Sequence, residues 1–338
     1  MAKNIILVTG CAGFIGFHVA KKLLQKKYKI IGIDNINSYY STKLKRDRLS
    51  ELKKFKYFNF FKIDLVNKKK LDHIVKKFKP KYIIHLAAQA GVRYSIKNPF
   101  AYVRSNLIGF TNILEISRNN KIKHLIYASS SSVYGASKEQ PYKEDDPVAH
   151  PLAFYGATKR SNELMAHSYS YLYGLPTTGL RFFTVYGPWG RPDMALFLFV
   201  KNIFQGKKIN VFNHGNHIRD FTYIDDIVSC VCKLIFKIPK RKKKHKFKDP
   251  STSIAPFEIL NIGNNNPTKL MDYIDEIEIQ LKKKAIKKFL PLQKGDIGST
   301  FASKQKLFKV IKFSPKTSIE LGIKKFINWY LNYYNLKK

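Results

Sequence analysis

The sequence predicts an α/β fold, a doubly wound parallel sheet with a smaller C-terminal α+β region. Short runs rich in β-branched and aromatic residues alternate with helical patterns through the first 180 residues. The first run leads directly into a glycine-rich turn, and the alternation stops after Phe183. Alternation at this spacing is typical of βαβ units, which form parallel sheets with helices on both faces. The 338 residues suffice to bury a core of this kind.

The individual elements follow from the spacing of apolar residues. Short apolar runs predict strands at 4–10, 29–34, 58–65, 81–87, 124–129 and 177–183. Apolar positions three and four residues apart predict helices at 14–27, 67–78, 100–118 and 154–173. Beyond Phe183, a loop rich in glycine and proline leads to an apolar helix and short strands, and 318–334 has the pattern of an amphipathic helix.

The change of pattern predicts a division of the chain into two parts and a loop. We expect a dinucleotide-binding part at 1–182, joined by about 219–238, and a substrate-binding region at 183–218 and 256–338. The connection 239–255 is rich in lysine and is expected to be a loop.

The formal net charge of +39 raises the question of a nucleic-acid partner. The excess is mostly lysine along the whole chain, arginine is scarce, and no nucleic-acid-binding motif accompanies it. We therefore expect no nucleic-acid partner and attribute the charge to a general lysine bias, with some attraction for anionic substrates. The run 240–248 is the one place where a polyanion could bind, although a solvated loop is the favoured interpretation.

Targeting features and cysteine usage favour a cytoplasmic protein. No signal peptide precedes the first strand, and the longest apolar runs are far shorter than the roughly 20 residues of a membrane-spanning helix. The chain has three cysteines, Cys11, Cys230 and Cys232, whose spacing suits neither a zinc site nor a disulfide. We expect no membrane association and no metal.

The turn after the first strand has the spacing of a dinucleotide-binding site. Gly10, Gly13 and Gly16 lie between this strand and the first helix, where glycine lets the backbone approach a pyrophosphate and the helix N-terminus favours negative charge. Asp34 ends the second strand, where its carboxylate would accept the adenosine ribose hydroxyls and repel a 2′-phosphate, so NAD is favoured over NADP. Asp64 ends the third strand, either to hold the adenine amino group or to cap a helix. This pattern predicts a Rossmann-type fold.

Tyr155 and Lys159 form a candidate catalytic pair. They are four residues apart in a helical pattern and thus share one face. A tyrosine is a poor base at neutral pH, but a nearby ammonium and a cationic nicotinamide would stabilise its phenolate. Tyr155 could then remove a proton from a substrate hydroxyl while hydride leaves the same carbon.

The glycine turn, the stretch "SSSSVYG" (129–135) and the Tyr155–Lys159 pair together resemble the extended short-chain dehydrogenase/reductase superfamily, in its nucleotide-sugar epimerase and dehydratase branch. More narrowly, the stretches 85–99, 173–199 and 219–228 resemble the UDP-glucuronate 4-epimerase family. The similarity runs from about residue 3 to residue 335 and is weakest at 238–256.

The resemblance implies a reaction and a site. The C4 hydroxyl of UDP-glucuronate is oxidised with NAD, the 4-keto sugar turns its other face to the nicotinamide, and hydride returns to give UDP-galacturonate, which would feed polysaccharide synthesis. Ser130 binds O4 and relays the proton to Tyr155, while Lys159 also binds the nicotinamide ribose. The expected cofactor site comprises Gly10, Gly13, Phe14, Ile15, Gly16, Asp34, Asn35, Asp64, Leu65, Leu86, Ala88, Gln89, Asn106, Ser129, Tyr155, Lys159 and Phe183.

The residues after Ser130 separate this reaction from its relatives. Related dehydratases have acidic residues there, and decarboxylating relatives have a glutamate at the position of Ser132. Hydroxyl groups are too weakly acidic or basic for that chemistry. Oxidation of glucuronate at C4 gives a β-keto acid, which readily loses carbon dioxide. We expect Ser131, Ser132, Thr184 and Arg191 to hold the substrate carboxylate so that this decarboxylation does not occur.

Two further arginines are candidates for contact with the substrate. By resemblance Arg219 pairs with the diphosphate, and Arg93 follows the fourth strand near the cofactor, where it could touch the substrate. Epimerisation of neutral UDP-sugars, decarboxylation of UDP-glucuronate and a silent dinucleotide-binding sensor stay open as alternatives. The family also implies a homodimer through the helices at 100–118 and 154–173.

Overall fold

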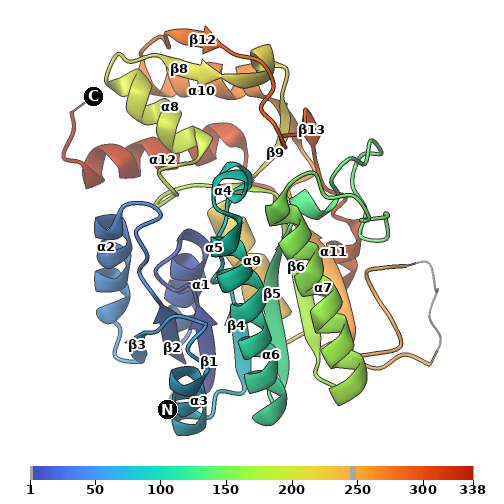
Figure 1. The fold of residues 1–338 in the computed structure, drawn as a ribbon. Coiled ribbons are helices and arrows are strands. Elements are labelled where there is room, and N and C mark those ends of the chain that lie inside the picture. Colours follow the sequence, from blue (N-terminus) through green and yellow to red (C-terminus); the bar gives the residue numbers. More distant parts are fainter. Residues whose placement is uncertain (1–2, 244–248, 338) are drawn as a thin grey trace.

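The computed structural model describes residues 3–243 and 249–337. Its centre is a seven-stranded sheet in the order β10-β6-β5-β4-β1-β2-β3, and every neighbouring pair of these strands is parallel (Figure 1). The strands are β1 (Lys3–Thr9), β2 (Tyr28–Asp34), β3 (Phe58–Lys62), β4 (Tyr82–His85), β5 (His124–Ser130), β6 (Thr177–Phe182) and β10 (Phe257–Ile262). The predicted doubly wound parallel sheet is confirmed.

The sheet is buried on both faces because its strands are apolar on both sides. In β1, Ile6 and Val8 face one hydrophobic cluster and Leu7 faces the other. Helices α1 (Phe14–Gln25), α2 (Thr42–Lys53) and α9 (Ile224–Leu234) contribute to the first cluster. Helices α3 (Lys68–Phe78), α6 (Gly109–Asn119) and α7 (Phe154–Tyr173) contribute to the second.

The smaller region lies above the carboxyl ends of the strands in Figure 1. In it β9 (Ile218–Tyr223) pairs with β7 (Thr184–Tyr186), β11 (Pro267–Lys269) and β13 (Ser299–Thr300), and β8 (Ile209–Val211) pairs with β12 (Lys287–Phe289). Its helices are α8 (Ala195–Phe204), α10 (Leu270–Leu281) and α12 (Ile319–Tyr333); α11 (Gln305–Ile311) lies beside β10.

The strands differ from the predicted division of the chain in two places. The segment Phe257–Ile262 is an edge strand of the large sheet, although 256–338 was expected in the smaller region. Conversely, Ile218–Tyr223 belongs to the smaller sheet, while α9 directly after it packs on α1 as expected. Of the predicted lysine-rich loop 239–255, residues 244–248 lie outside the described residues.

Two helical segments also differ from the prediction. Helix α2 was not predicted at all. The predicted helix 100–118 is three pieces: α5 (Pro99–Tyr102), a π-helical turn (Val103–Ile108) and α6, with α4 (Val92–Lys97) just before them. Within the described part of the chain, no helix is long and apolar enough to cross a membrane.

Candidate active site

A cavity of about 260 Å³ opens at the carboxyl ends of the central strands. Loops that follow parallel strands meet at this edge, which is where open α/β sheets bind ligands. The predicted site residues that line the cavity are Gly10, Gly13, Phe14, Ile15, Gly16, Asp34, Asn35, Asp64, Leu65, Leu86, Ala88, Gln89, Ser129, Ser130, Tyr155, Lys159, Phe183 and Arg191. The fold thus brings the glycine turn, the serines and the Tyr155–Lys159 pair into one space.

The glycines of this turn are required because the backbone packs closely on itself and on the end of β4. A Cβ on Gly10 would lie 2.7 Å from the backbone nitrogen of Ala87, and one on Gly16 would lie 2.1 Å from the carbonyl oxygen of Gly10. Gly13 precedes the first turn of α1, and no side chain caps this helix. Its first N–H groups are therefore available to an anion, and the helix dipole favours one there.

Asp34 has the position expected of a ribose-binding carboxylate. Its oxygens accept hydrogen bonds from the backbone N–H groups of Ala12 (3.1 Å) and Ile36 (2.8 Å), which fix the carboxylate at the cavity wall. Burial raises the pKa of Asp34, whereas the N–H of Ile36 and the charge of Lys45 oppose that rise. The glycine cradle, the uncapped helix and this carboxylate together fit an adenine dinucleotide without a 2′-phosphate.

Two predicted cofactor residues have roles within the protein. Asp64 accepts hydrogen bonds from Asn35 and from the N–H of Val66, and the N-cap of α3 is Asn67, so Asp64 does not cap that helix. Asn106, in the π-helical turn, does not line the cavity. Its side chain instead bonds both backbone groups of Gln89 at 2.8 and 3.0 Å, and thereby holds a residue that does.

Tyr155 and Lys159 extend from the first turns of α7 towards the end of β5. The ammonium of Lys159 is buried and donates to the carbonyl of Ala128 at 2.9 Å. Burial lowers the pKa of Lys159 to about 8. Burial raises the pKa of Tyr155, while a hydrogen bond with Ser130 and the charge of Arg191 oppose that rise. The phenol is therefore neutral in the free protein, and it forms a hydrogen bond with Ser130, the residue predicted to relay the proton.

The serines after β5 form a tight turn beside this pair. The hydroxyl of Ser130 donates to the hydroxyl of Ser132 (3.1 Å) and accepts from the backbone N–H of Ser132 (3.2 Å). Ser131 and Ser132 begin a short 3₁₀ turn, Ser131–Val133, and both are half-buried. Neither of these two serines lines the cavity of about 260 Å³, and the positions directly after Ser130 carry hydroxyl groups and no carboxylate.

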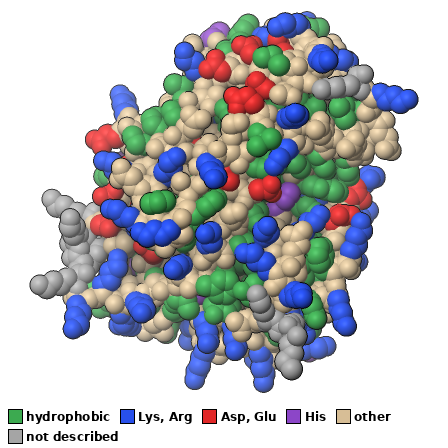
Figure 2. Space-filling model, turned by 180° about the vertical axis from the view of Figure 1, so that it is seen from behind, with side chains coloured by type: hydrophobic (Ala, Val, Ile, Leu, Met, Phe, Trp, Pro, Cys, Tyr) green, Lys and Arg blue, Asp and Glu red, His purple; other side chains and the backbone are tan. Residues whose placement is uncertain are grey.

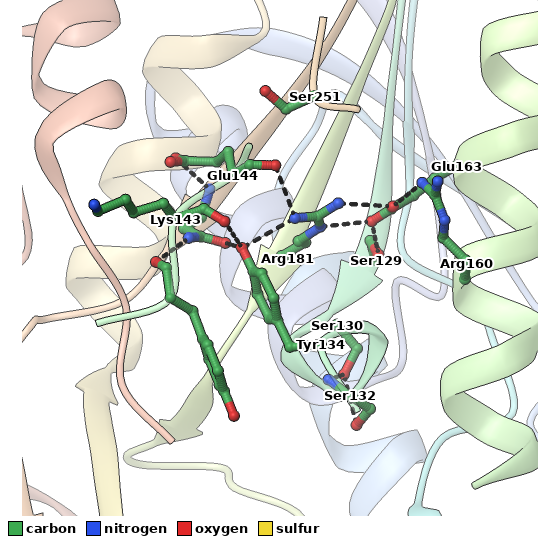
Figure 3. Close-up of polar contacts among 12 residues, drawn as sticks. Ser129, Ser130, Ser132, Tyr134, Lys143, Glu144, Arg160, Glu163, Arg181 and Ser251 are labelled. Carbon is green, nitrogen blue, oxygen red and sulfur yellow. Dashed lines mark hydrogen bonds and ion pairs between the residues drawn. The ribbon is translucent and has the colours of Figure 1, made fainter. Parts of the chain in front are cut away.

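A buried ion pair lies next to the serine turn, as Figure 3 shows. Arg181 on β6 and Glu163 on α7 are both fully buried and bind each other at 2.9 and 3.0 Å. Ser129 donates to the same carboxylate at 2.7 Å. Burial alone would raise the pKa of Glu163, but Arg181 and Ser129 hold it below its usual value. The pair therefore fixes α7 relative to the end of β5.

Arg191 reaches the cavity from a loop that several elements hold. Its guanidinium binds Asp193 through Nε (3.0 Å) and Nη2 (2.6 Å), so Nη1 remains for a ligand. Trp189, two residues before Arg191, has a φ of +61° and packs on Trp329 of α12. Arg48 of α2 donates to the carbonyl groups of Trp189 and Gly190, and also to that of Ala12 in the glycine turn. Thr184 and Arg191 share the wall of a small apolar cavity next to the main one.

The two arginines that are candidates for contact with the substrate lie outside this cavity. Arg219, on β9, donates to the carboxylate of Asp296 at 2.9 Å and to the carbonyl of Gly298. Arg93 is exposed on α4 and lies 4.8 Å from the ring centre of Phe212 in the smaller region. The structure therefore does not bring them together with Tyr155.

Helix α2 and the loop before it supply residues that the sequence did not reveal. Tyr39 and Lys45 line the cavity, and Tyr39 also donates to Asp193. Lys45 donates to Asn37 at 2.7 Å, and burial lowers its pKa to about 8 while Asp34 opposes this. The sequence does contain a pattern that indicates α2, because one face of this helix is buried and consists of Leu44, Lys45, Arg48, Leu49 and Leu52. Two of these residues are cations, so the face does not have the apolar periodicity by which a helix is predicted.

Two further side-chain features bear on the chemistry. The thiol of Cys11 is fully buried beneath the glycine turn, and burial raises its pKa well above the usual value, so it is not a reactive thiolate. Among the residues with described positions, no three histidine, cysteine or carboxylate side chains gather into a metal site.

Comparison with known families agrees with this geometry. The model of the NAD dependent epimerase/dehydratase family matches residues 6–248. Protein CapI of Staphylococcus aureus is 53% identical over 331 residues, which cover 97% of this chain and 99% of that protein. A probable UDP-glucuronate 4-epimerase of Rhizobium meliloti is 45% identical over 327 residues, which cover 96% of each chain.

A solved structure is similar over the same length. The UDP-glucuronic acid 4-epimerase of Bacillus cereus, in complex with UDP-glucuronic acid and NAD, superposes with a TM-score of 0.88 at 33% identity, and the alignment covers 98% of this chain and 100% of that one.

Proposed function

The chain belongs to the NAD dependent epimerase/dehydratase family, and on that premise we propose that it interconverts UDP-glucuronate and UDP-galacturonate by epimerisation at C4, with tightly bound NAD. One observation carries the proposal: Tyr155, Lys159 and Ser130 converge on one cavity, and the positions after Ser130 bear hydroxyl groups. Such a site moves a proton and a hydride at one carbon without an acid or base for elimination.

The cofactor site is built from three features of this chain. The N–H groups at the start of α1 bind the pyrophosphate, Asp34 accepts the adenosine ribose hydroxyls, and Lys159 donates to the nicotinamide ribose. NAD, when bound there, accepts a hydride from C4 and returns it to the opposite face. We assign NAD binding to residues 1–182, which contain strands β1 to β6. We assign binding of the UDP-sugar to the smaller region.

Tyr155 moves the proton. In the free protein its pKa is raised, so the phenolate needs positive charge nearby, which Lys159 and Arg191 supply once substrate has displaced water. Tyr155 then takes the O4 proton through Ser130 and gives it back after the sugar has turned over. Ser130 can relay because its hydroxyl both donates and accepts.

The carboxylate of the substrate must be held while C4 is a ketone, because a β-keto acid loses carbon dioxide readily. We assign this task to Ser131, Ser132, Thr184 and Arg191. Asp193 fixes the Nε and Nη2 edge of Arg191, so the guanidinium can offer Nη1 without swinging. We assign Arg219, with Arg93 nearby, to the substrate diphosphate. The diphosphate would compete with the carboxylate of Asp296 for the guanidinium of Arg219.

The test is incubation of purified protein with UDP-glucuronate and no added cofactor, followed by proton NMR of the separated products. UDP-galacturonate as the product of the wild-type protein, and none from Tyr155→Phe, is the expected result. The variant keeps the ring and its packing and removes only the hydroxyl, so it controls for contaminating activity.

Three other outcomes would overturn parts of the proposal. A UDP-pentose with carbon dioxide would mean that the site decarboxylates. Turnover of UDP-glucose or UDP-galactose in place of UDP-glucuronate would make it an epimerase of neutral sugars. No turnover of any UDP-sugar, with NAD supplied, would leave a dinucleotide-binding sensor.

We also propose a cytoplasmic homodimer. All three cysteines of the chain are free thiols, which supports a reducing compartment. Apolar side chains on α5 to α7 support the dimer: Phe100, Ile108 and Leu164 are 81%, 49% and 55% exposed. A second copy packed on these helices would cover them.

A further inference from the structure

The helix-to-strand connections of the large sheet lie at one edge of the molecule. Because all neighbouring strands are parallel, these connections gather where the strands begin, at the lower edge in Figure 1. They are residues 26–29, 53–57, 76–82, 119–124, 171–176 and 235–243. We call this surface the lysine edge. The candidate active site lies at the opposite edge, where the strands end.

The lysine edge carries a concentrated positive charge. Its six segments contain sixteen lysines and one arginine and no aspartate or glutamate. All but Lys29 of these cations are exposed. The lower rim of the molecule in Figure 2 carries a row of Lys and Arg side chains. Over the described residues, Lys54 is the one member in an ion pair, with Glu51. A general lysine bias predicts an even spread and does not explain this clustering.

The fold itself gains little from so many cations. A lysine in the last turn of a helix complements the helix dipole, which accounts for Lys53, Lys76 and Lys77. Lysines beyond the helix ends, such as Lys81 and Lys123, receive no such benefit and repel their neighbours. A negatively charged partner would remove this repulsion.

Part of the lysine edge is hollowed. Lys76, Lys79, Lys81, Lys121 and Lys123 line an open cavity of about 340 Å³ between the connections that precede β4 and β5. Its remaining lining residues, Pro80 and Asn120, carry no charge. Five ammonium groups around a cavity of this size suit a phosphate group with its attached ester.

Aromatic and aliphatic side chains lie among the lysines. Tyr57 and Phe78 are half-buried between lysine neighbours, and Phe236 and Ile238 are 39% and 36% exposed. Lysine stems and aromatic rings together are typical of a water–lipid interface. Nucleic-acid surfaces favour arginine, of which this edge has one, Arg241. The side-chain composition therefore favours lipid.

We propose that the lysine edge docks this protein onto an anionic phospholipid surface, with a lipid phosphate in the cavity that the five lysines line. In that orientation the candidate active site faces away from the lipid and stays open to soluble substrate. The sequence alone predicted no membrane association, because it could not show that lysines from five separate segments share one edge. The proposal does not depend on the reaction assigned above.

Sedimentation with vesicles tests the proposal on the full-length protein as purified. We expect binding to vesicles of phosphatidylglycerol and phosphatidylcholine and none to phosphatidylcholine alone, with release in 0.5 M salt. The variant K76Q/K77Q/K81Q/K123Q should partition at least about a hundredfold less, since each lysine near an anionic surface contributes roughly a factor of five.

The matched control removes the same charge elsewhere. K201Q/K207Q/K208Q/K288Q changes four exposed lysines of the smaller region and should bind vesicles within about threefold of wild type. Equal loss in both variants would reduce the effect to net charge and overturn the docking site. Absence of binding to anionic vesicles at physiological salt would overturn it as well. Tighter binding to duplex DNA than to vesicles, lost in the first variant, would replace lipid by nucleic acid.

Discussion

At the residue scale, the site separates groups that do chemistry from groups that hold charge in place. In the proposed reaction Tyr155 and Ser130 exchange a proton, whereas Lys159 is a buried ammonium whose contact in the free protein is the carbonyl of Ala128. Arg191 is similar in that Asp193 holds one edge of its guanidinium. Both cations are kept in position before substrate arrives, so little reorganisation is needed during the reaction.

The first prediction at this scale concerns Arg191. Arg191→Ala should lower kcat/KM for UDP-glucuronate by about a hundredfold, because a hydrogen bond between two charged groups contributes up to roughly 3 kcal/mol. It should also release UDP-pentose, since the carboxylate is no longer held. Product NMR measures both effects. Arg46→Ala, an exposed arginine on α2, is the control, and unchanged products from Arg191→Ala would remove Arg191 from the carboxylate site.

The second prediction concerns the stability cost of Lys159. The folded chain releases this proton at about pH 8, whereas an unfolded chain holds it to about 10.5. The unfolded state thus binds more protons between these values, and stability from this group rises with pH there. Lys159→Met should be more stable by about 2 to 3 kcal/mol at pH 7, with a difference that shrinks from pH 8 to 10.5. Urea unfolding of NAD-free protein measures it; a difference independent of pH would contradict this account.

At the scale of elements, α2 joins two loops that the reaction needs. Through Arg48 it binds the glycine turn at Ala12 and the Arg191 loop at Trp189 and Gly190. The terminal helix α12 holds the same loop by packing Trp329 and Tyr333 on Trp189. Segments that are far apart in sequence therefore fix the cofactor site and the carboxylate site relative to each other.

Replacement of Arg48 tests this link. Arg48→Met keeps an unbranched apolar side chain but leaves three carbonyl groups and Tyr40 without their donor, so unfolding should become easier by about 3 kcal/mol or more. NAD retention and UDP-glucuronate turnover should both fall, because both loops lose the contact. Arg46→Met, on the exposed face of the same helix, is the matched control and should change neither. Wild-type stability of Arg48→Met would show that packing alone holds the loops.

At the scale of the whole molecule, the three proposed functions belong to three separate surfaces. The edge where the strands end carries the candidate active site, the edge where they begin carries the lysines, and the layer of α5 to α7 exposes apolar side chains. This arrangement follows from the parallel sheet, which places all strand-to-helix loops at one edge and all helix-to-strand loops at the other.

The proposed dimer can be tested on that third surface. Leu164→Glu should yield monomers at micromolar concentration. Burial of an unpaired carboxylate in an apolar helix interface costs more free energy than the contact between the subunits contributes. Analytical ultracentrifugation measures the oligomeric state. Ile279→Glu, on α10 and 67% exposed, is the control and should remain dimeric. A wild-type monomer at this concentration would reject the dimer itself.

The sequence by itself determined the doubly wound sheet, the cofactor turn and the catalytic pair, because these depend on local periodicity and on short fixed spacings such as Gly10–Gly13–Gly16 and Tyr155–Lys159. It missed α2, since Lys45 and Arg48 interrupt the apolar face that marks a helix, and it missed the π-helical turn, whose register no periodicity records. Tertiary structure alone decided that Arg48 joins the glycine turn at Ala12 to the loop at Trp189, that Arg219 pairs with Asp296, and that lysines from five segments meet at one edge. These are contacts between distant segments, which the packing of the sheet creates and which no local pattern encodes.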